Sequence, residues 1–236
     1  PAFVSVPLAG LTSKKYADTL AQHIRPDSAR SAQTIKPGQP LPFESDQTTH
    51  YSVVDKAGNM VAVTYTLNTN FGTGIVAAGT GILLNNEMDD FSAKPGVPNA
   101  YGLVGGAANA VAAGKRPLSS MTPTLVLKDQ QPWLVTGSPG GARIITTVLQ
   151  QIVNGIDFGM NPAEAASTVR FHHQWMPDEL RVEKGFSPDT LHLLRQKGQN
   201  VVVKPAMGRT QTIQVQGQAL WGYSDPRNPD GLTLGY

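Results

Sequence analysis

The sequence predicts a layered α+β fold with a mainly antiparallel sheet. Two pairs of β-rich runs are each joined by a short turn, at 51–67 and at 124–137. Helical periodicity is concentrated between 144 and 198, and further short β-rich runs follow it. No internal repeat is visible. Hairpins and helices in this order are typical of layered α+β proteins.

The composition fits a globular domain or part of a larger one. Hydrophobic residues make up 40% of the 236 positions and charged residues 15%, and the formal net charge is only +2. Without a basic block, nucleic acid is a poor candidate partner. The absence of cysteine excludes disulfides and zinc–thiolate sites. No apolar run approaches the ~18 residues that span a membrane.

The first 47 residues differ from the rest. The chain begins at Pro1 without an initiator methionine or signal peptide, so we expect a fragment or processed piece. A helix is predicted over Lys14–Ile24, and the polar stretch 25–47 is broken by prolines, as in a linker or extended tail. The sequence therefore divides into residues 1–47 and residues 48–236.

A β-hairpin is predicted near the start of the second part. Tyr51–Asp55 and Met60–Leu67 flank a short turn that contains Gly58. The second run alternates, so that one face is apolar and the other carries hydroxyls, including that of Thr66, and the amide of Asn68. A second hairpin and further strands are predicted at Gly81–Leu84, Thr124–Lys128, Pro132–Gly137, Asn200–Val203, Thr212–Val215 and Leu220–Tyr223.

Three helices are predicted after the second hairpin. The first, Ile144–Ile156, carries its apolar residues on one broad stripe, as a helix that packs on a core does. The next begins at the candidate cap Asn161, with Pro162 in its first turn. The last runs over Ser187–Lys197 and ends at Gly198.

Thr48 is the most informative candidate for catalysis. A threonine hydroxyl is a poor nucleophile until a base activates it, and cleavage of the Gln47–Thr48 bond would place a new α-amino group within its reach. A proline-rich stretch ends just before Thr48 and a strand begins near it, which suits a self-cleaving bond. The alternative is an ordinary threonine between a polar tail and a strand.

Two polar residues of the next β-rich run allow two interpretations. Thr66 and Asn68 belong either to a solvated sheet face, which is common in antiparallel sheets, or to a site. In a site, Thr66 would hydrogen-bond the nucleophile and Asn68 would hold a polar end of a substrate.

Two polar segments are candidate binding regions. Asn85–Phe91 clusters three acids and two amides. It is a calcium loop without EF-hand spacing, a solvated acidic turn, or a site for a substrate ammonium group. Lys115–Met121 presents the adjacent hydroxyls of Ser119 and Ser120, which would hold a carboxylate or lie in a solvated turn.

A glycine-rich turn, Gly137–Gly141, follows an apolar strand and precedes the clearest helix. Backbone N–H groups at such a helix start bind anions. The turn is neither a Walker loop nor a G-x-S-x-G elbow. It is either a plain tight turn or an oxyanion hole made by Gly140 and Gly141.

The histidines give no metal site. His172 and His173 are adjacent and point apart on a regular element, so we interpret them as structural. His50, directly after the threonine pair, would contact the site. A Ser/His/Asp triad cannot be argued from spacing.

Taken together, these segments resemble the γ-glutamyltranspeptidase family, which belongs to the N-terminal nucleophile hydrolases. The resemblance is closest to enterobacterial, periplasmic members and implies a partial αββα sandwich. Residues 1–47 would be the C-terminal end of the large subunit and residues 48–236 the small subunit. The similar blocks, in the same order, are Thr48–Ser52, Gly58-Asn59, Val61–Asn68, Phe71-Gly72, Asn85–Ser92, Pro117–Met121, Gly137–Gly141 and Phe171–Trp175.

The resemblance implies the catalytic roles. Thr48 would attack first the Gln47–Thr48 bond and then the γ-glutamyl amide, with its freed amine as general base. Thr66 would position and activate Thr48. The N–H groups of Gly140 and Gly141 would stabilise the oxyanion, at typically ~3 kcal/mol per donor.

The resemblance also implies how the donor binds. Asp90 would meet the donor ammonium, Ser119 and Ser120 its carboxylate, and Tyr101 would close over it as a lid. The residues implied for its α-amino and α-carboxyl groups are Asn68, Glu87, Asp90, Ser119 and Ser120. Glu87 is a departure, because enterobacterial relatives often carry glutamine there. The arginine that clamps the donor carboxylate would come from the part of the large subunit that is absent.

The partners follow from the same resemblance. The donor would be glutathione or another γ-glutamyl amide, and the acceptor water, an amino acid or a dipeptide. The large subunit would be a partner, with no cofactor or metal, no nucleic acid and no membrane span, in the periplasm or outside the cell. The rival hypotheses are an acylase for glutaryl amides or cephalosporins, and an inactive or unprocessed structural fragment. A glutaryl donor lacks the ammonium that Asp90 would bind.

Overall fold

The structure, a computed structural model, describes residues 3–4, 8–35, 48–92, 94, 96–97 and 105–235. In these residues the strands form three sheets, and every neighbouring pair but one is antiparallel. The predicted α+β fold with a mainly antiparallel sheet is therefore confirmed. The sheets contain, in spatial order, β1 (Thr49–Val54) and β2 (Met60–Tyr65); β3 (Thr124–Lys128), β4 (Gln131–Thr136), β8 (Gln211–Gln216) and β9 (Ala219–Ser224); and β5 (Phe171–His172), β6 (Leu180–Glu183) and β7 (Val201–Lys204), of which the last two are parallel.

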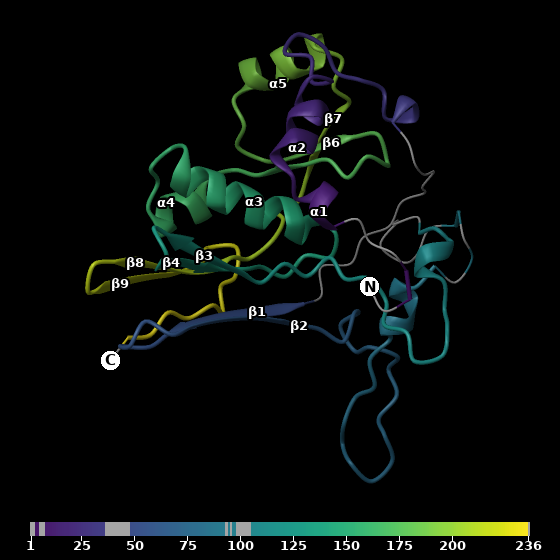
Figure 1. Ribbon diagram of the computed structural model, residues 1–236, viewed down its shortest axis with the longest axis vertical. Coiled ribbons are helices and arrows are strands. Elements are labelled where there is room, and N and C mark those ends of the chain that lie inside the picture. Colours follow the sequence, from purple (N-terminus) through teal and green to yellow (C-terminus); the bar gives the residue numbers. More distant parts are fainter. Residues whose placement is uncertain are drawn as a thin grey trace.

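Two of the sheets lie face to face, and helices cover one outer side (Figure 1). α3 (Arg143–Ile156) and α4 (Pro162–Ser167) lie on one face of the four-stranded sheet, and the hairpin β1–β2 packs against the other. The described residues thus supply three layers, α, β and β. No described element covers the outer face of the hairpin, where Tyr65 is 63% exposed.

The hairpin β1–β2 forms where the sequence predicts it. Asp55 shapes the turn by accepting hydrogen bonds from the N–H groups of Ala57 and Asn59, each at 2.9 Å. Gly58 supplies the left-handed conformation of the turn, with φ of +82°. The remaining strands that the structure shares with the prediction begin and end within two residues of the predicted bounds.

The polar face of this hairpin points inward. His50 pairs with Thr64 in the register and is only 6% exposed, whereas Tyr65 on the apolar face is exposed. The interpretation of the polar face as a solvated one is therefore wrong. The hydroxyls can be buried because they find partners: Ser52 Oγ donates to the carbonyl O of Gln211 in β8 at 2.9 Å.

α3 forms at the predicted place but buries another face. In the predicted apolar stripe Val148 is buried, but Ile145 and Leu149 are 50% and 56% exposed. The buried face is shifted from that stripe toward Thr147, against which loop 205–210, which joins β7 to β8, packs; a Cβ on Gly208 would lie 2.6 Å from Thr147 Cγ2. The buried residues of the helix are Arg143, Ile144, Thr147, Val148 and Gln151.

α4 and α5 (Pro188–Gln196) confirm the predicted helix starts. Asn161 and Glu164 form a complete capping box at the first turn of α4. Ser187 Oγ accepts the N–H of Thr190 at 3.1 Å and so caps α5.

The structure differs from the prediction at three strands. Gly81–Leu84 makes only an isolated bridge between Val76 and Leu83, in the long loop that projects after β2 (Figure 1). The sequence does not predict β5 or β6. In β6 apolar and charged residues alternate in the sequence but burial does not, because Arg181 and Glu183 are buried along with their apolar neighbours.

The N-terminal segment is loosely attached. α1 (Leu8–Leu11) and α2 (Lys14–Ala21) bury no side chain, and α2 ends before the predicted Ile24. Ala32, in a short 3₁₀ turn, is fully buried. The proline-rich stretch from residue 36 to 47 and most of the loop predicted at 94–106 lie outside the described residues.

Candidate active site

A pocket with about 330 Å³ of empty space opens between the end of β2 and the start of α3. Met121, Ala142 and Ile144 form part of its wall. Seven predicted site residues, from five separate parts of the sequence, line the rest: Thr48, Thr66, Asn68, Asp90, Ser119, Ser120 and Gly141.

Among the described residues, two predicted site residues, Gly140 and Glu87, do not line this pocket. Gly140 directly precedes one of the lining glycines. Glu87 belongs to the same 3₁₀ turn as Asp90. Gln47 and Tyr101 lie outside the described residues.

After β2 the chain bends and brings Thr66 and Asn68 to the pocket wall. Asn68 has φ of +76°, a conformation that asparagine tolerates better than most residues, and its N–H donates to Thr66 Oγ1 at 2.8 Å. Its side chain is 2% exposed and donates from Nδ2 to the carbonyl O of Asn86 at 3.1 Å. The Thr66 hydroxyl and the Asn68 amide are thus held at fixed positions.

Asn109 links the acidic turn to the serine pair, and sequence reasoning missed it. Its Nδ2 donates to the carbonyl O of Asp90 at 2.7 Å. Its Oδ1 accepts the N–H of Leu118, directly before Ser119, at 3.0 Å. One side chain therefore sets the spacing between a carboxylate and a hydroxyl of the pocket. No sequence signal marks it, because it lies in an alanine-rich stretch.

The acidic turn is electrostatically tuned. Burial, the nearby negative charge of Asp90 and a hydrogen bond with it raise the pKa of Glu87 to about 7. Burial also raises the pKa of Asp90, against the hydrogen bond from Glu87, and the charge of Asp89 adds to the rise. A cation placed beside this pair would restore both carboxylates to the charged form.

The turn Gly137–Gly141 joins β4 to α3 and brings Gly141 to the pocket wall. Gly140 has φ of +138° and Gly141 of +58°, conformations open to glycine. Neither of their N–H groups finds a hydrogen-bond acceptor within the described residues. The N-terminal end of the 14-residue helix α3 adds its positive potential at the same place.

Loop 205–210 and the first residue of β8 hold this turn from behind. The N–H of Arg209 donates to the buried Ser138 Oγ at 2.8 Å, and the N–H of Gln211 donates to the Gly137 carbonyl at 3.1 Å. A Cβ on Gly140 would lie 3.6 Å from Gly208 Cα, so the two backbones are in close contact.

His50 supports the same turn and does not line the pocket. A Cβ on Gly137 would lie 2.2 Å from His50 Cε1, so only glycine fits beside the ring. The ring nitrogens lie 2.8 Å from Thr64 Oγ1 and 3.1 Å from Ser52 Oγ. Burial lowers the pKa of His50 to about 4, so the ring is neutral at physiological pH.

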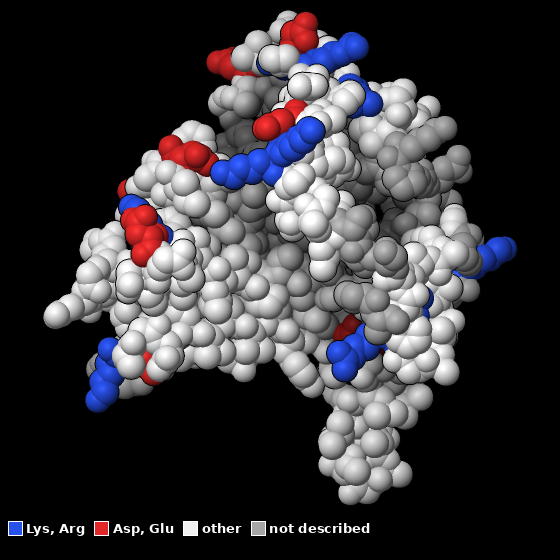
Figure 2. Space-filling view, viewed as in Figure 1, with Lys and Arg blue, Asp and Glu red and all other residues white. Residues whose placement is uncertain are grey.

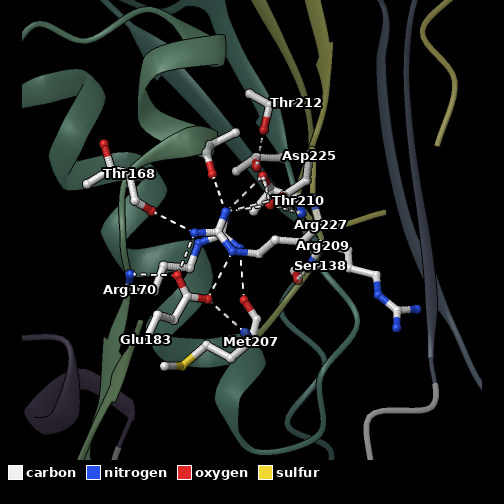
Figure 3. Close-up of polar contacts among 12 residues, drawn as sticks. Ser138, Thr168, Arg170, Glu183, Met207, Arg209, Thr210, Thr212, Asp225 and Arg227 are labelled. Atoms are coloured by element: carbon white, nitrogen blue, oxygen red, sulfur yellow. Dashed lines mark hydrogen bonds and ion pairs between the residues drawn. The ribbon is translucent and has the colours of Figure 1, made fainter. Parts of the chain in front are cut away.

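Three buried charged side chains and the partly buried Arg227 lie behind loop 205–210 (Figure 3). Arg170 Nη2 lies 2.5 Å from Asp225 Oδ2, and Arg227 Nη2 lies 2.5 Å from Glu183 Oε2. Burial alone would raise the pKa of Asp225, but Arg170 and backbone donors outweigh it and hold that pKa below its usual value.

This charge network reaches the loop through backbone atoms. Arg170 Nη1 donates to the Met207 carbonyl at 2.9 Å, and Glu183 Oε1 accepts the Met207 N–H at 2.7 Å. Asp225 Oδ2 accepts the N–H of Thr210 at 2.9 Å. Sequence reasoning missed the network because its partners are distant in the sequence, as Arg170 and Asp225 are at 55 positions apart.

The adjacent histidines have separate partners. His172 bonds Thr146 and Gln174, at 2.7 and 2.9 Å, while His173 Nε2 lies 3.4 Å from Asp178 Oδ1. Among the described residues no three His, Asp or Glu side chains converge on a point that would hold a metal ion.

The distribution of charge and of apolar helices limits which partners the described surface suggests. In Figure 2 acidic and basic side chains are interspersed around the rim of this face and leave a broad uncharged middle. No described helix is both long enough and apolar enough to cross a membrane.

Comparison with known proteins gives the family. A family model described as Gamma-glutamyltranspeptidase matches residues 1–234. The glutathione hydrolase proenzyme of Escherichia coli (strain K12) is 67% identical over 237 residues, which take in 100% of this chain and 41% of that protein. The chain belongs to the γ-glutamyltranspeptidase family. It spans about two fifths of the length of this relative.

Solved structures agree with the family assignment. A mutant of Helicobacter pylori γ-glutamyltranspeptidase is 57% identical, with a TM-score of 0.75 over 76% of this chain and 100% of that chain. A cephalosporin acylase from Bacillus halodurans is 28% identical, with a TM-score of 0.79 over 96% of this chain and 39% of that chain. The fold is that of an N-terminal nucleophile hydrolase, and the described residues carry three layers of its αββα sandwich.

Proposed function

We propose that this site catalyses γ-glutamyl transfer and hydrolysis on glutathione and related γ-glutamyl amides, through an ester on Thr48. One observation carries the proposal: Thr48 shares a pocket with the hydroxyl of Thr66, the helix-start glycine Gly141 and the carboxylate of Asp90. A nucleophile, an oxyanion site and an ammonium site are thus within one small volume.

Thr48 acts first on its own chain. Its Oγ attacks the carbonyl carbon of Gln47, the acyl group moves from nitrogen to oxygen, and water hydrolyses the ester to leave a free α-amine on Thr48. The lengths of the matches support such a break. The whole Helicobacter pylori chain aligns with only 76% of this chain, whereas the Escherichia coli proenzyme aligns with 100% of this chain. Residues 1–47 are then the end of a large subunit and residues 48–236 the small subunit.

The same hydroxyl then attacks the γ-carbonyl of the donor. The α-amine of Thr48 takes the hydroxyl proton and Thr66 orients the hydroxyl, while the N–H groups of Gly140 and Gly141 bind the oxyanion. Collapse expels the donor's amine, which receives that proton. Water, an amino acid or a dipeptide then takes the γ-glutamyl group from the ester.

The donor binds by its charged α-carbon end. Its ammonium meets Asp90 and Glu87, beside the Asn68 amide, and its carboxylate meets the hydroxyls of Ser119 and Ser120. The raised pKa of Glu87 and its contact with Asp90 support this, because a cation relieves the repulsion within such a pair.

The proposal includes three further roles and a location. Tyr101 covers the bound donor as a lid. The large subunit completes the sandwich and supplies a carboxylate-binding arginine. The Escherichia coli relative is a glutathione hydrolase proenzyme, and we place this protein in the periplasm or outside the cell.

An acylase is the second candidate, because the Bacillus halodurans cephalosporin acylase has the same fold over 96% of this chain. Its expected donor, a glutaryl-type amide, carries no ammonium. The pair Glu87 and Asp90 would then lie against an uncharged part of the donor, at a desolvation cost.

The deciding experiment uses the full-length precursor, wild type and Thr48→Ala. Mass spectrometry should find a break at Gln47–Thr48 in the wild type only, and a chromogenic γ-glutamyl anilide should be hydrolysed by the wild type only. Release from a glutaryl anilide, with none from the γ-glutamyl compound, would favour the acylase. An intact wild-type chain that releases no product from either anilide would favour the hypothesis of an inactive structural fragment.

A further inference from the structure

Among the described residues before Thr48, hydrogen bonds to the rest of the protein come from one short stretch, 26–32. α1 and α2 bury no side chain, and Leu20 and Ile24 are 52% and 74% exposed. Ala32, eleven positions after the last residue of α2, is in contrast 0% exposed. The firm contact is therefore an irregular segment, and the amphipathic helix α2 takes little part in it.

Ala32 is held on both sides of its peptide backbone. Its N–H donates to Asp178 Oδ2 at 2.9 Å, and its carbonyl O accepts the indole N–H of Trp175 at 2.8 Å. Both backbone groups of one fully buried residue are thus satisfied by two side chains of the later part of the chain.

A second pair of hydrogen bonds lies at the C-terminal end of α5. The N–H of Ala29 donates to the Lys197 carbonyl at 2.5 Å, and Lys197 Nζ donates to the Pro26 carbonyl at 2.5 Å. A Cβ on Gly198 would lie 3.8 Å from Ala29 Cβ, in ordinary contact. Residues 26–32 and their partners Trp175, Asp178 and Lys197 are here called the tail clasp.

Trp175 and Asp178 of the tail clasp also contact residues outside the tail. His173 Nε2 lies 3.4 Å from Asp178 Oδ1, and its Nδ1 accepts the N–H of Trp175 at 3.0 Å. Asn200 Nδ2 donates to the Asp178 carbonyl at 2.9 Å. The groups that hold Ala32 are therefore positioned by contacts that do not involve the tail.

All four hydrogen bonds use backbone atoms of the tail. Trp175, Asp178 and Lys197 thus recognise the backbone conformation of the tail rather than its side chains. A small side chain is required only at Ala32, which has no exposed surface. Such recognition tolerates change at the exposed positions of the tail.

We propose that the tail clasp is the joint that keeps residues 1–47 bound to residues 48–236 after the chain is cut before Thr48. The inference rests on the proposed function because it assumes that the chain is cut before Thr48. The contacts themselves are those described above. Before cleavage the clasp is intramolecular. After cleavage no peptide bond links the two pieces, and non-covalent contacts, those of the tail clasp among them, retain residues 1–47.

The test measures amide hydrogen exchange at Ala29 and Ala32, by NMR, in the 236-residue chain. Residues 44–47 are replaced by the recognition sequence of a site-specific protease and Thr48 by alanine, so that the cut does not depend on self-cleavage. The isolated peptide 1–47 provides the unprotected reference rates. We expect both amides to exchange at least about tenfold more slowly than in the peptide, before and after the cut.

Two variants remove the clasp and one leaves it intact. Ala32→Arg should bring both amides within about threefold of the free peptide, and Trp175→Phe, which keeps a ring but removes the indole donor, should speed exchange at Ala29 and Ala32 about three- to tenfold. Leu20→Ala, which removes apolar atoms from the same tail outside the clasp, should leave the exchange rates at Ala29 and Ala32 unchanged. Amides of β6 and β7 report whether the body of each variant is folded.

The outcomes separate the two proposals. Loss of protection on cutting, or equal rates in Ala32→Arg, Trp175→Phe and Leu20→Ala, overturns the tail clasp. Protection that survives the protease cut upholds it even where the wild-type precursor never cleaves itself, a result that would instead overturn the proposed function.

Discussion

The backbone N–H of Arg209 donates a 2.8 Å hydrogen bond to the hydroxyl of Ser138, which has no exposed surface. Ser138 stands two residues before Gly140, so this bond fixes the glycine turn to loop 205–210. The hydroxyl itself donates to the Pro139 carbonyl at 2.7 Å. The turn that carries Gly140 and Gly141 therefore depends on a side chain that does not line the pocket.

Ser138→Ala should lower kcat more than it changes KM for the donor. The substitution leaves the Arg209 N–H without its partner in a partly buried place, at a cost of about 1–3 kcal/mol, and loosens the turn proposed to meet the oxyanion in the transition state. Steady-state kinetics of the full-length enzyme check it. Ser224→Ala removes an exposed hydroxyl on β9 and should leave both constants unchanged; a rise in KM alone would contradict this role.

Gly208→Ala should destabilise the fold more than Gly217→Ala. Both residues have positive φ, +68° and +60°, so both substitutions carry about 1–2 kcal/mol of backbone strain. Only at Gly208 does the new methyl meet an obstacle, Thr147 at 2.6 Å, which adds about 1–3 kcal/mol. Urea unfolding measures the difference, and equal midpoints for the two variants would show that the loop yields without cost.

Glu183→Gln should lower the free energy of unfolding by about 3–5 kcal/mol, because it leaves Arg227 buried without its full countercharge. Glu179→Gln is the matched control. Its ion pair with Lys204 is partly exposed, and removal should cost at most about 1 kcal/mol. Thermal and urea unfolding of both variants compare them. A Glu183→Gln protein as stable as the control would mean that the charge network adds nothing to loop 205–210.

Glu87→Gln should remove a pH dependence of the free energy of unfolding near neutrality, measured by urea unfolding at several pH values. The folded pKa of Glu87, about 7, lies above its ordinary value of 4.5, so the folded state holds the proton more tightly than the unfolded state. Its contribution to stability is fully present below pH 4.5 and is lost as the pH rises through 7.

Binding of the donor should follow the opposite trend. The donor ammonium favours the ionised carboxylate, so KM for the donor should fall as the pH rises through 7 in the wild type. The Glu87→Gln enzyme should lack this step. A KM profile across pH 5.5–8.5, identical in the two proteins, would assign the titration elsewhere.

The elements that the sequence predicts are those specified by neighbouring residues. The turn built by Asp55 and Gly58 and the capping box of Asn161 and Glu164 involve positions three or fewer apart, and both form as predicted. The sequence blocks quoted for the family resemblance also lie largely on one pocket.

What the sequence does not predict depends on distant partners. β6 is a strand with two buried charges because distant residues satisfy them: Arg227 pairs with Glu183, and the Pro205 carbonyl accepts a hydrogen bond from Arg181. Asn109 gains its role only when the acidic turn and the serine pair lie side by side. α3 leaves Ile145 and Leu149 of its apolar stripe exposed and buries Thr147, against which loop 205–210 packs, and helical periodicity carries no information about that contact.

The register of β1 and β2 has a consequence for the proposed nucleophile. Thr49 already pairs with Tyr65, so a chain end created at Thr48 would have one residue of slack beyond the sheet. An ordinary N-terminus frays over several residues and its amine samples a large volume. Here the amine and the hydroxyl would be confined together before any substrate arrives, so that most of the entropy of bringing base to nucleophile is lost during folding rather than in each turnover.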